Sequence, residues 1–493
     1  MNSSNRPISS LNFAIFFSIP FLFLAFWSIW ASFSYWFDEL FSVTTSLMPF
    51  REMVDEIMRD VHPPLYQVLL KYWIEFFGHA EPQTRSFSFL AAFSTMIALI
   101  VGLRKQPITI VLPAVVFLGS AWLFTFYAQE TRSYALLMFL AMIATLLDLH
   151  RYNQADNLNR FVWYAILLVL SLTHYFGLIY AGILLISDLL QTGQIRFAVE
   201  RLLLGALIMI WPLIHYFLGD IAGKTAGNFW IKSEGLKTTL LTFGNALLAT
   251  PVKIYMLFGL PSLAAWVLNG LLLFFFLSLS IFKAKPEARI EIGRFSLYVF
   301  GFLAVVSIID MHTPISTGRN FIVLLPLLTI LFAEVFHVLW SCYSKSTYRF
   351  ALLLAVIGYV IASTYTTFNS MQSRWGPRQN WKSLASTVEN LGICNPHCWF
   401  FGSPVLARLY SYYFGPSMVT EPFSEIRSLS QLVEMSAKNT LPIIAAHFKQ
   451  SQLEELINAY PSWKCLEPNQ SWKSSVILLI PDVSSIPGLK SCL

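Results

Sequence analysis

The sequence predicts a polytopic, all-α membrane protein that carries a small α/β domain near its C-terminal end. Its composition is the first observation: of 493 residues, 56% are hydrophobic and 12% are charged, which is about half the charged share of an ordinary soluble protein. The second observation is the order of the chain, because long apolar runs continue to about residue 368 and polar residues return after it. We therefore predict a transmembrane domain over residues 1–368 and a soluble α/β domain over residues 369–493.

Apolar runs long enough to cross a bilayer as helices of roughly 20 residues recur along the first domain. They cover residues 11–34, 86–103, 107–125, 133–149, 202–218, 258–282, 295–309, 320–341 and 350–368. A further run, 161–190, is too long for one crossing and has Thr173 and His174 at its centre. We interpret it as two short crossings that turn there, which brings the prediction to about 11 transmembrane helices. No small-residue cleavage site stands out before Ser34, so we expect the first helix to be retained.

The basic residues predict the orientation of these helices. If the N-terminus is cytoplasmic, the inner connections are short and basic, as the positive-inside bias requires. Their basic residues are Arg104, Lys105, Arg151, Arg160, Arg196, Arg201, Lys283, Lys285, Arg289, Arg294, Lys345 and Arg349. The alternate loops and everything beyond residue 369 then face outward. The formal net charge of +6 therefore reflects the lipid bilayer of an inner or plasma membrane and not nucleic acid as a partner.

The first outer loop contains a predicted interfacial helix in the segment HPPLYQVLLKYWIEFFG. Pro63 and Pro64 stand at its start, where proline is tolerated. Apolar and aromatic residues recur at helical spacing after them, at Leu65, Val68, Leu69, Tyr72, Trp73 and Phe76. A helix of this composition is typical of one that lies along the membrane surface.

The C-terminal domain, about 125 residues long, is large enough for a small soluble fold. We expect a helix at NWKSLASTVENLG and strands at CWFFGS, LPIIAAHF and SSVILLIPD. Four of the five cysteines lie here: Cys394, Cys398, Cys465 and Cys492. In an exported domain they can form two disulfides in three alternative connectivities. A zinc site at Cys394, Cys398 and His397 is the weaker alternative, because no second closely spaced ligand pair follows.

Polar residues at the outer ends of the helices suggest a functional site. Asp38 and Glu39, in SYWFDEL, follow the first apolar run directly. By themselves they are equally well explained as solvated carboxylates at a helix end. The other polar residues near outer helix ends are Arg59, Asp60, His62, Arg85, Gln129, Glu130, Arg132, His174 and Arg319. Polar side chains gathered at one membrane face favour a site there.

Arginine and histidine in this set have both structural and functional interpretations. Arg132, in the short turn of YAQETRSYALL, can bind a lipid phosphate bidentately or simply snorkel to the surface; Arg319 has the same two interpretations. His62 either orients Asp60 or caps the interfacial helix. His174 needs a partner or water at a tight turn between apolar crossings, and a purely structural role is the alternative.

The order of these motifs resembles the GT-C membrane glycosyltransferases. An outer loop that opens with Asp-Glu is followed by HPPLY, YAQETRSYALL, THYFG, NFWI and GRNFIVLLPLL. The branch that the chain resembles contains the dolichyl-phosphate-mannose protein mannosyltransferases and the bacterial lipid A aminoarabinose transferase. The resemblance runs from residue 11 to about residue 340.

This resemblance implies a polyprenyl-phosphate-linked sugar as donor and assigns roles to particular residues. It implies that Asp38 is the catalytic carboxylate with Glu39 as its companion, and that Arg132 and Arg319 lie near the donor phosphate. Glu130 lies where relatives often add an acidic residue. The expected substrate-binding or orienting residues are Asp60, His62, Gln129, Glu130, Tyr134, His174 and Tyr175.

The predicted reaction is inverting transfer of a monosaccharide to an acceptor hydroxyl on the extracytoplasmic face, with Asp38 as general base. The acceptor is a glycan, a lipid or a protein, and the variable C-terminal domain leaves that choice open. No cofactor is required, although the carboxylates of Asp38, Glu39, Asp60 and Glu130 offer the oxygens that a divalent cation binds. The alternatives are a transporter or flippase for lipid-linked sugars, and a polysaccharide polymerase or ligase. A transporter would place ionisable groups near the bilayer middle, whereas here they lie toward one face.

Overall fold

The computed structural model describes residues 10–29, 34–151, 157–191, 195–219, 235–248, 262–343, 345–375, 381–390, 399–401, 412–413, 443–446, 458, 464–466, 476–480 and 489–491. The chain forms two compact units, and each is described by itself. The first unit comprises Met1–Trp30 and Thr45–Phe368, and the second comprises Ala31–Thr44 and Asn369–Leu493.

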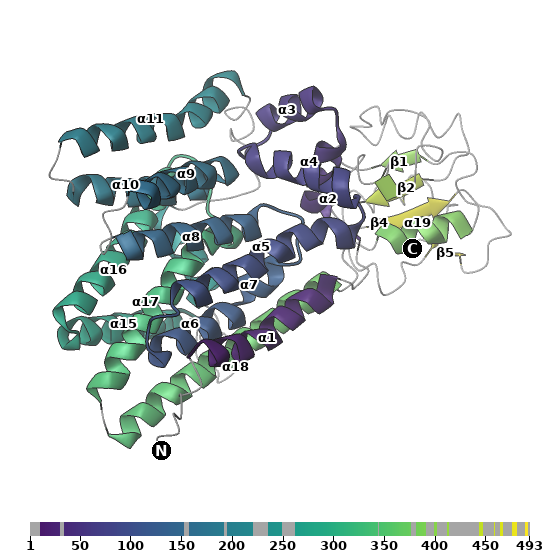
Figure 1. Ribbon diagram of the computed structural model, residues 1–493. Helices are drawn as coiled ribbons and strands as arrows, with labels where there is room; N and C mark the ends of the chain where they lie inside the picture. Colours follow the sequence, from purple (N-terminus) through teal and green to yellow (C-terminus); the bar gives the residue numbers. More distant parts are fainter. Residues whose placement is uncertain are drawn as a thin grey trace, which may run out of the picture. The chain divides into compact units, whose positions relative to one another are not determined.

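The first unit is helical (Figure 1). Its elements up to residue 151 are α1 (Ser10–Ile29), the end of α2 (Phe37–Leu47), α3 (Phe50–Arg59), α4 (Leu65–Phe77), α5 (Glu81–Gly102), α6 (Ile108–Ser120), α7 (Trp122–Tyr127) and α8 (Tyr134–Arg151). The later ones are α9 (Asn157–Thr173), α10 (Tyr175–Gln191), α11 (Ile195–Leu218), α13 (Leu236–Phe243), the π-helical segment η1 (Gly244–Leu248), α15 (Ser262–Lys283), α16 (Pro286–Asp310), the 3₁₀ segment η2 (Gly318–Leu324), α17 (Leu325–Cys342) and α18 (Ser346–Trp375). Helices α5, α8, α9 and α10 pack in sequence against one another, and α6 packs between α1 and α17.

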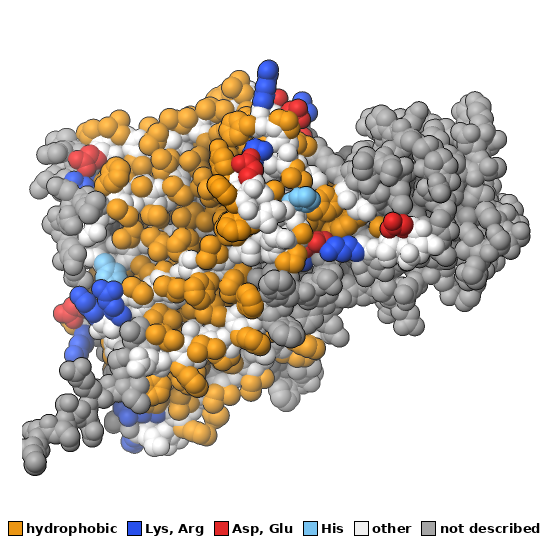
Figure 2. All heavy atoms as spheres, turned by 45° about the vertical axis from the view of Figure 1, so that its right-hand side comes forward, with side chains coloured by type: hydrophobic (Ala, Val, Ile, Leu, Met, Phe, Trp, Pro, Cys, Tyr) orange, Lys and Arg blue, Asp and Glu red, His pale blue; other side chains and the backbone are white. Residues whose placement is uncertain are grey.

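The apolar segments confirm a multi-pass membrane protein. Five helices in the described part of the chain are long and apolar enough to cross a bilayer: Glu81–Gly102, Ala198–Leu218, Pro286–Asp310, Gly318–Cys342 and Ser346–Met371. Six shorter apolar helices are Asn12–Phe26, Ile108–Ser120, Tyr134–His150, Asn159–Thr173, Tyr175–Leu190 and Leu273–Lys283. Each of the eleven corresponds to one expected apolar segment. On the face of this helical unit that Figure 2 shows, hydrophobic side chains cover much of the described surface, as contact with lipid requires.

The long run 161–190 divides as expected, between α9 and α10. His174 is the single residue between the two helices. The turn is tight because Gly177 lies so close to α9 that a Cβ atom there would overlap the carbonyl oxygen of Leu170. The sequence THYFG therefore builds a turn that larger residues at position 177 cannot form.

Two helical features differ from the prediction. The run 107–125 is not one helix, because Ala121 takes an extended conformation, with ψ of 125°, and separates α6 from α7. In the loop after α11 the sequence analysis placed no element, yet α13 and η1 form there and α13 packs against α16. Hydropathy misses both features, since Ala121 lies among apolar residues and α13 is only eight residues long.

The first loop contains two helices, α3 and α4. The predicted helix in HPPLYQVLLKYWIEFFG is confirmed as α4, which follows Pro64 directly. Its face with Tyr66, Leu70 and Ile74 is buried, whereas Tyr72 and Phe76 are exposed. An apolar exposed face is what an interfacial helix presents to lipid.

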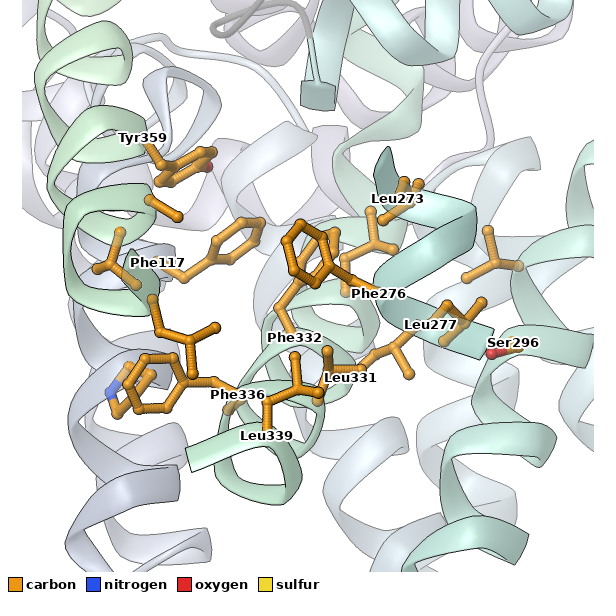
Figure 3. A pocket seen from close by; sticks show the side chains of 18 of the residues that line it. Phe117, Leu273, Phe276, Leu277, Ser296, Leu331, Phe332, Phe336, Leu339 and Tyr359 are labelled. Atoms are coloured by element: carbon orange, nitrogen blue, oxygen red, sulfur yellow. The ribbon is translucent and has the colours of Figure 1, made fainter. Parts of the chain in front are cut away.

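A partly open apolar cavity of about 360 Å³ lies in the first unit between α6, α15, α16, α17 and α18, with Phe243 of α13 in its wall. Figure 3 shows phenylalanine and leucine side chains pointing into it, among them Phe117, Phe276 and Phe332. Ser296 and Tyr359 supply the only hydroxyl groups among its lining residues. A cavity of this lining stays free of water and accepts apolar chains.

The described part of the second unit contains α19 (Trp381–Asn390) and a five-stranded sheet in the order β1-β2-β4-β3-β5. The strands are β1 (Trp399–Phe401), β2 (Ile443–Ala446), β3 (Lys464–Leu466), β4 (Val476–Ile480) and β5 (Leu489–Ser491). Strands β1 and β2 are parallel and the other pairs are antiparallel. The expected helix and three expected strands are thus α19, β1, β2 and β4. Of the cysteines, Cys394, Cys398 and Cys492, together with His397, lie outside the described residues, and Cys465 is described only through the backbone of β3.

Candidate functional site

Asp60 and His62 form the first part of a polar cluster in the first unit. Helix α3 ends at Arg59, and Asp60 follows in an extended conformation that turns the chain toward α4. The Nδ1 of His62 lies 2.9 Å from Oδ2 of Asp60. Burial alone would raise the pKa of Asp60, but the hydrogen bond from His62 and the charge of Arg132 hold it well below its ordinary value. His62 thus contacts Asp60, and α4 has no side-chain cap.

Arg132 extends this cluster from the turn between α7 and α8. Its Nη2 lies 3.3 Å from Nε2 of His62. A guanidinium group can only donate, so Nε2 of His62 accepts and Nδ1 carries the hydrogen that is donated to Asp60. The three side chains thus form one directed chain from Arg132 through His62 to Asp60. Because Arg132 is only 6% exposed, this chain holds its guanidinium in one place.

His174 lies beside His62, in the turn before α10. The ring centroids of the two histidines are 5.4 Å apart, and the ring of Tyr134 lies 5.7 Å from that of His174. The backbone N–H of Phe176 donates to Nδ1 of His174 at 3.1 Å, which makes His174 the N-cap of α10. Burial, reinforced by nearby positive charge, lowers the pKa of His174 well below its ordinary value, so the ring is neutral at pH 7.

Tyr134 connects the histidines to Arg319. Tyr134 is the first residue of α8, and the guanidinium carbon of Arg319 lies 5.7 Å from the centre of its ring, a cation–π contact. Six of the predicted residues are therefore brought together from four separate segments: Asp60, His62, Arg132, Tyr134, His174 and Arg319. In this cluster, the rings of His62, His174 and Tyr134 lie in a row between Arg132 and Arg319.

The loop before Arg319 is held by residues that the sequence analysis did not single out. Oδ1 of Asp310 accepts the backbone N–H groups of Ile315 and Ser316 at 2.8 and 3.0 Å. Its Oδ2 accepts the hydroxyl of Thr239, from α13, at 2.7 Å. Asn320 donates to the carbonyl oxygen of Ile315 at 2.9 Å. The signal in the sequence was an aspartate at the end of an apolar run, directly before a loop with Pro and Ser.

Gln129 and Glu130 lie in the same turn as Arg132 and make hydrogen bonds that hold it. The amide of Gln129 donates to the carbonyl oxygen of Thr125 at 2.7 Å. The carbonyl oxygen of Glu130 accepts the hydroxyl of Ser88, from α5, at 2.5 Å. These bonds fix the turn that presents Arg132.

Tyr175 points to a different neighbour from that of His174. Its hydroxyl is 2.6 Å from Nδ1 of His215 in α11, and the two rings stack. Tyr175 thus joins α10 to α11 beside the polar cluster, and His215 is a second residue that the sequence analysis did not select.

Asp38 and Glu39 belong to the second unit and stand in the first turn of α2. Glu39 is fully buried, and its Oε2 accepts the backbone N–H of Trp36 at 3.4 Å, the reach of a capping-box glutamate. Asp38 is partly exposed. The start of this helix, where the dipole favours negative charge, therefore gives Glu39 a structural position and leaves Asp38 more accessible.

The short segment before α2 is bound within the same unit. The backbone N–H of Tyr35 donates to the hydroxyl of Tyr413 at 2.6 Å, and Ser34 accepts the backbone N–H of Lys382 at 2.9 Å. Residues 34–35 are thus tied to the chain beyond residue 369. No group of three His, Cys, Asp or Glu side chains that could hold a metal ion occurs within the described ranges.

Two solved structures of one protein share this fold. The crystal structure of ArnT from Cupriavidus metallidurans in the apo state matches with a TM-score of 0.56 and 14% sequence identity, over 95% of this chain and 98% of that one. The structure of the same protein bound to undecaprenyl phosphate matches with a TM-score of 0.55 and 14% identity, over 97% and 99% of the two chains. The chain has the ArnT fold. The polytopic helical fold that the order of the motifs implied is thereby confirmed.

Sequence comparison adds no closer relative. No family model matches the chain, and no curated protein matches it either. The ArnT likeness extends over nearly all of both chains, so it includes both the helical unit and the C-terminal region. The shared fold is therefore recognisable at a level of identity where sequence comparison fails.

Proposed function

We propose that this protein is a membrane glycosyltransferase that transfers a monosaccharide from a polyprenyl-phosphate donor to an acceptor hydroxyl. The observation that carries the proposal is the pair of arginines, Arg132 and Arg319, at the two ends of one connected polar cluster. The similarity to ArnT also supports the proposal, because one ArnT structure contains undecaprenyl phosphate.

The polar cluster has the chemistry that a lipid phosphate requires. Arg132 and Arg319 supply delocalised positive charge and forked donors that match phosphate oxygens. His62 and Asp60 orient Arg132 through hydrogen bonds of 3.3 and 2.9 Å. Both arginines stabilise the departing polyprenyl phosphate as negative charge develops on it.

The apolar cavity suits the lipid part of the same donor. A row of ring contacts leads from the cluster to the cavity wall: His174 to Phe176 at 5.9 Å, Phe176 to Phe321 at 5.5 Å and Phe321 to Phe243 at 5.7 Å. Phe243 lines the cavity. A ligand with a charged head and a long apolar chain matches this succession of polar and apolar surfaces.

Asp38 is our proposed general base. It removes the proton from the acceptor hydroxyl as the oxygen attacks the anomeric carbon, and the bond from that carbon to the phosphate oxygen breaks. The products are the glycosylated acceptor with inverted configuration, polyprenyl phosphate and a protonated Asp38. Glu39 serves as its companion by holding the start of α2.

The remaining residues position these groups. Gln129, Glu130 and Tyr175 stabilise the turns around the cluster, and Tyr134 presents its ring to Arg319. We propose metal-independent chemistry, because the arginines supply the positive charge that a cation would add. The protein would work in the inner membrane, with its N-terminus cytoplasmic and its active site and C-terminal domain extracytoplasmic. A glycan, a lipid or a protein hydroxyl is the acceptor.

The test is incubation of the purified protein with a panel of polyprenyl-phosphate-linked monosaccharides and candidate acceptors. We expect one donor to be consumed, with release of polyprenyl phosphate and transfer of the sugar. The matched Asp38→Asn protein should leave the donor intact. Movement of intact donor across proteoliposomes without consumption would instead establish a transporter, and consumption only of lipid-diphosphate oligosaccharides would establish a polymerase or ligase.

A further inference from the structure

The two nitrogens of His174 have different surroundings. Nδ1 accepts the backbone N–H of Phe176 at 3.1 Å and thereby caps α10. Since Nδ1 is an acceptor in a neutral ring, the hydrogen must lie on Nε2. The cap therefore fixes both the orientation of the ring and its tautomer.

Nε2 of His174 has no hydrogen-bond partner within the part of the chain that the structure describes. The residue is only 5% exposed, so solvent does not satisfy this donor by simple exposure. A buried N–H without an acceptor is costly, and most such groups in native proteins are found paired. The N–H therefore calls for an acceptor atom supplied from outside the described chain.

The neighbours of His174 define the chemistry of that acceptor. The ring centroids of His62 and Tyr134 lie 5.4 and 5.7 Å from that of His174. Arg132 contacts the ring of His62, and Arg319 contacts the ring of Tyr134. The carboxylate of Asp60 is held by His62. An acceptor that enters between the arginines is favoured when it is an anion.

We propose that the Nε2–H of His174 donates a hydrogen bond to a phosphate oxygen of the lipid donor, as a neutral third contact between Arg132 and Arg319. This inference rests on the proposed function and assigns His174 to substrate recognition, beyond its role as a helix cap. The neutral Nε2–H group of His174 favours an oxygen acceptor in one direction, and it adds no third positive charge to the site.

A pair of substitutions separates the two roles of His174. The side-chain amide of asparagine reaches the position of Nδ1, so His174→Asn keeps an N-cap and loses the outer donor. Glutamine places its amide N–H near the position of Nε2, so His174→Gln keeps the donor and loses the cap. One variant therefore keeps only the helix cap, and the other keeps only the outer hydrogen-bond donor.

The measurements are the apparent KM for the lipid-linked donor and the thermal unfolding temperature of the purified protein. We expect His174→Asn to raise the donor KM about tenfold or more while keeping wild-type stability. His174→Gln should unfold at a lower temperature but keep the donor KM within about threefold of wild type. The inference is overturned if His174→Gln uses the donor no better than His174→Asn does.

A direct binding comparison separates this inference from the proposed function. Wild-type protein is titrated with a polyprenyl phosphate and with the matching polyprenol, and we expect a clear preference for the phosphate. The preference should fall about tenfold in His174→Asn. If the wild type shows no preference, the proposed function itself is wrong. If wild type and His174→Asn prefer the phosphate equally, only the role of His174 is wrong.

Discussion

The two ends of α8 have different buried polar contacts. At one end, Asp148 accepts a hydrogen bond from Tyr298 at 3.3 Å and pairs with Arg294 at 3.6 Å. At the other end, the ring of Tyr134 lies under the guanidinium group of Arg319. The helix rise of about 1.5 Å per residue separates the two positions by about 21 Å. A second buried ion pair, Arg201 with Asp188, stands at the same end as Asp148 because Asp188 is near the end of α10.

The two ends use buried arginine in different ways. Arg294 and Arg201 bind carboxylates on neighbouring helices, which is how a membrane protein satisfies a charge that holds its helices together. At the other end, Arg132 donates to the imidazole of His62 and Arg319 lies over the ring of Tyr134. We propose that the arginine–carboxylate pairs at one end hold helices together, and that the arginines beside His62 and Tyr134 at the other end serve a ligand.

The largest expected effect comes from Asp38. Asp38→Asn removes the proposed base and should lower the transfer rate about 10²–10⁴-fold, the usual contribution of general base catalysis. The matched control is Glu39→Gln, because glutamine also serves in a capping box and should retain most activity. Rates are measured as release of polyprenyl phosphate. A nearly normal rate for Asp38→Asn would remove Asp38 from the base role.

Breaking the ion pair at the opposite end should affect stability instead. Asp148→Asn leaves Arg294 buried beside a neutral amide and should destabilise the protein by about 3 kcal/mol. Thermal unfolding in detergent measures the loss. The donor KM of the protein that remains folded should match wild type. An unchanged unfolding temperature together with weakened donor use would contradict the division of roles between the two ends.

Arg132→Lys tests the geometry of the ligand end. Lysine keeps the charge but loses the planar fork that donates both to His62 and to a phosphate. We expect about a tenfold increase in donor KM with little change in the unfolding temperature. Arg201→Lys is the matched control and should lower stability without changing the donor KM. Equal effects of the two substitutions on the donor KM would show that Arg132 has no special relation to the donor.

Filling the apolar cavity should discriminate donors by chain length. Val356 lines the cavity from α18, so Val356→Trp should raise the KM several-fold for a long polyprenyl donor and leave a short-chain donor unaffected. Leu354, exposed on the same helix, provides the control substitution Leu354→Trp. The same KM change for both chain lengths would exclude the cavity as the site of the lipid chain.

The smallest expected effect is the pH dependence of Asp60. Its pKa is depressed in the folded protein, so its stabilising contribution is complete above the ordinary aspartate pKa of about 4. That contribution is lost as the pH falls toward the lower folded value. The stability difference between wild type and Asp60→Asn should therefore be constant near neutral pH and shrink below about pH 4. A difference that grows on acidification would contradict the interaction with His62.

Much of the fold was predictable because lipid imposes a simple rule on the sequence. Apolar length identified the transmembrane segments, and Thr173 with His174 marked the turn between two of them. Short strands were harder: β3 (KCL) and β5 (LKS) have three residues each and lack the apolar run that marks β1 (WFF). The break at Ala121 was hidden because both flanking segments are equally apolar.

The members of the site were predictable as residue types, but their partners were not. Arginine, histidine and aspartate near helix ends in a chain with few charges were a visible signal. The contact of His62 with Arg132 joins positions 70 residues apart, and helical periodicity carries no information about such a pairing. Asp310 escaped notice because its function is to bind the backbone of its own loop.

A structure of the full protein determined with a bound polyprenyl phosphate tests the central claim most directly. We predict that the phosphate lies within about 3 Å of guanidinium nitrogens of Arg132 or Arg319 and of Nε2 of His174, with the lipid chain directed to the cavity at Phe243. A phosphate bound at the Asp148–Arg294 end, or one that contacts neither Arg132 nor Arg319, would contradict the account.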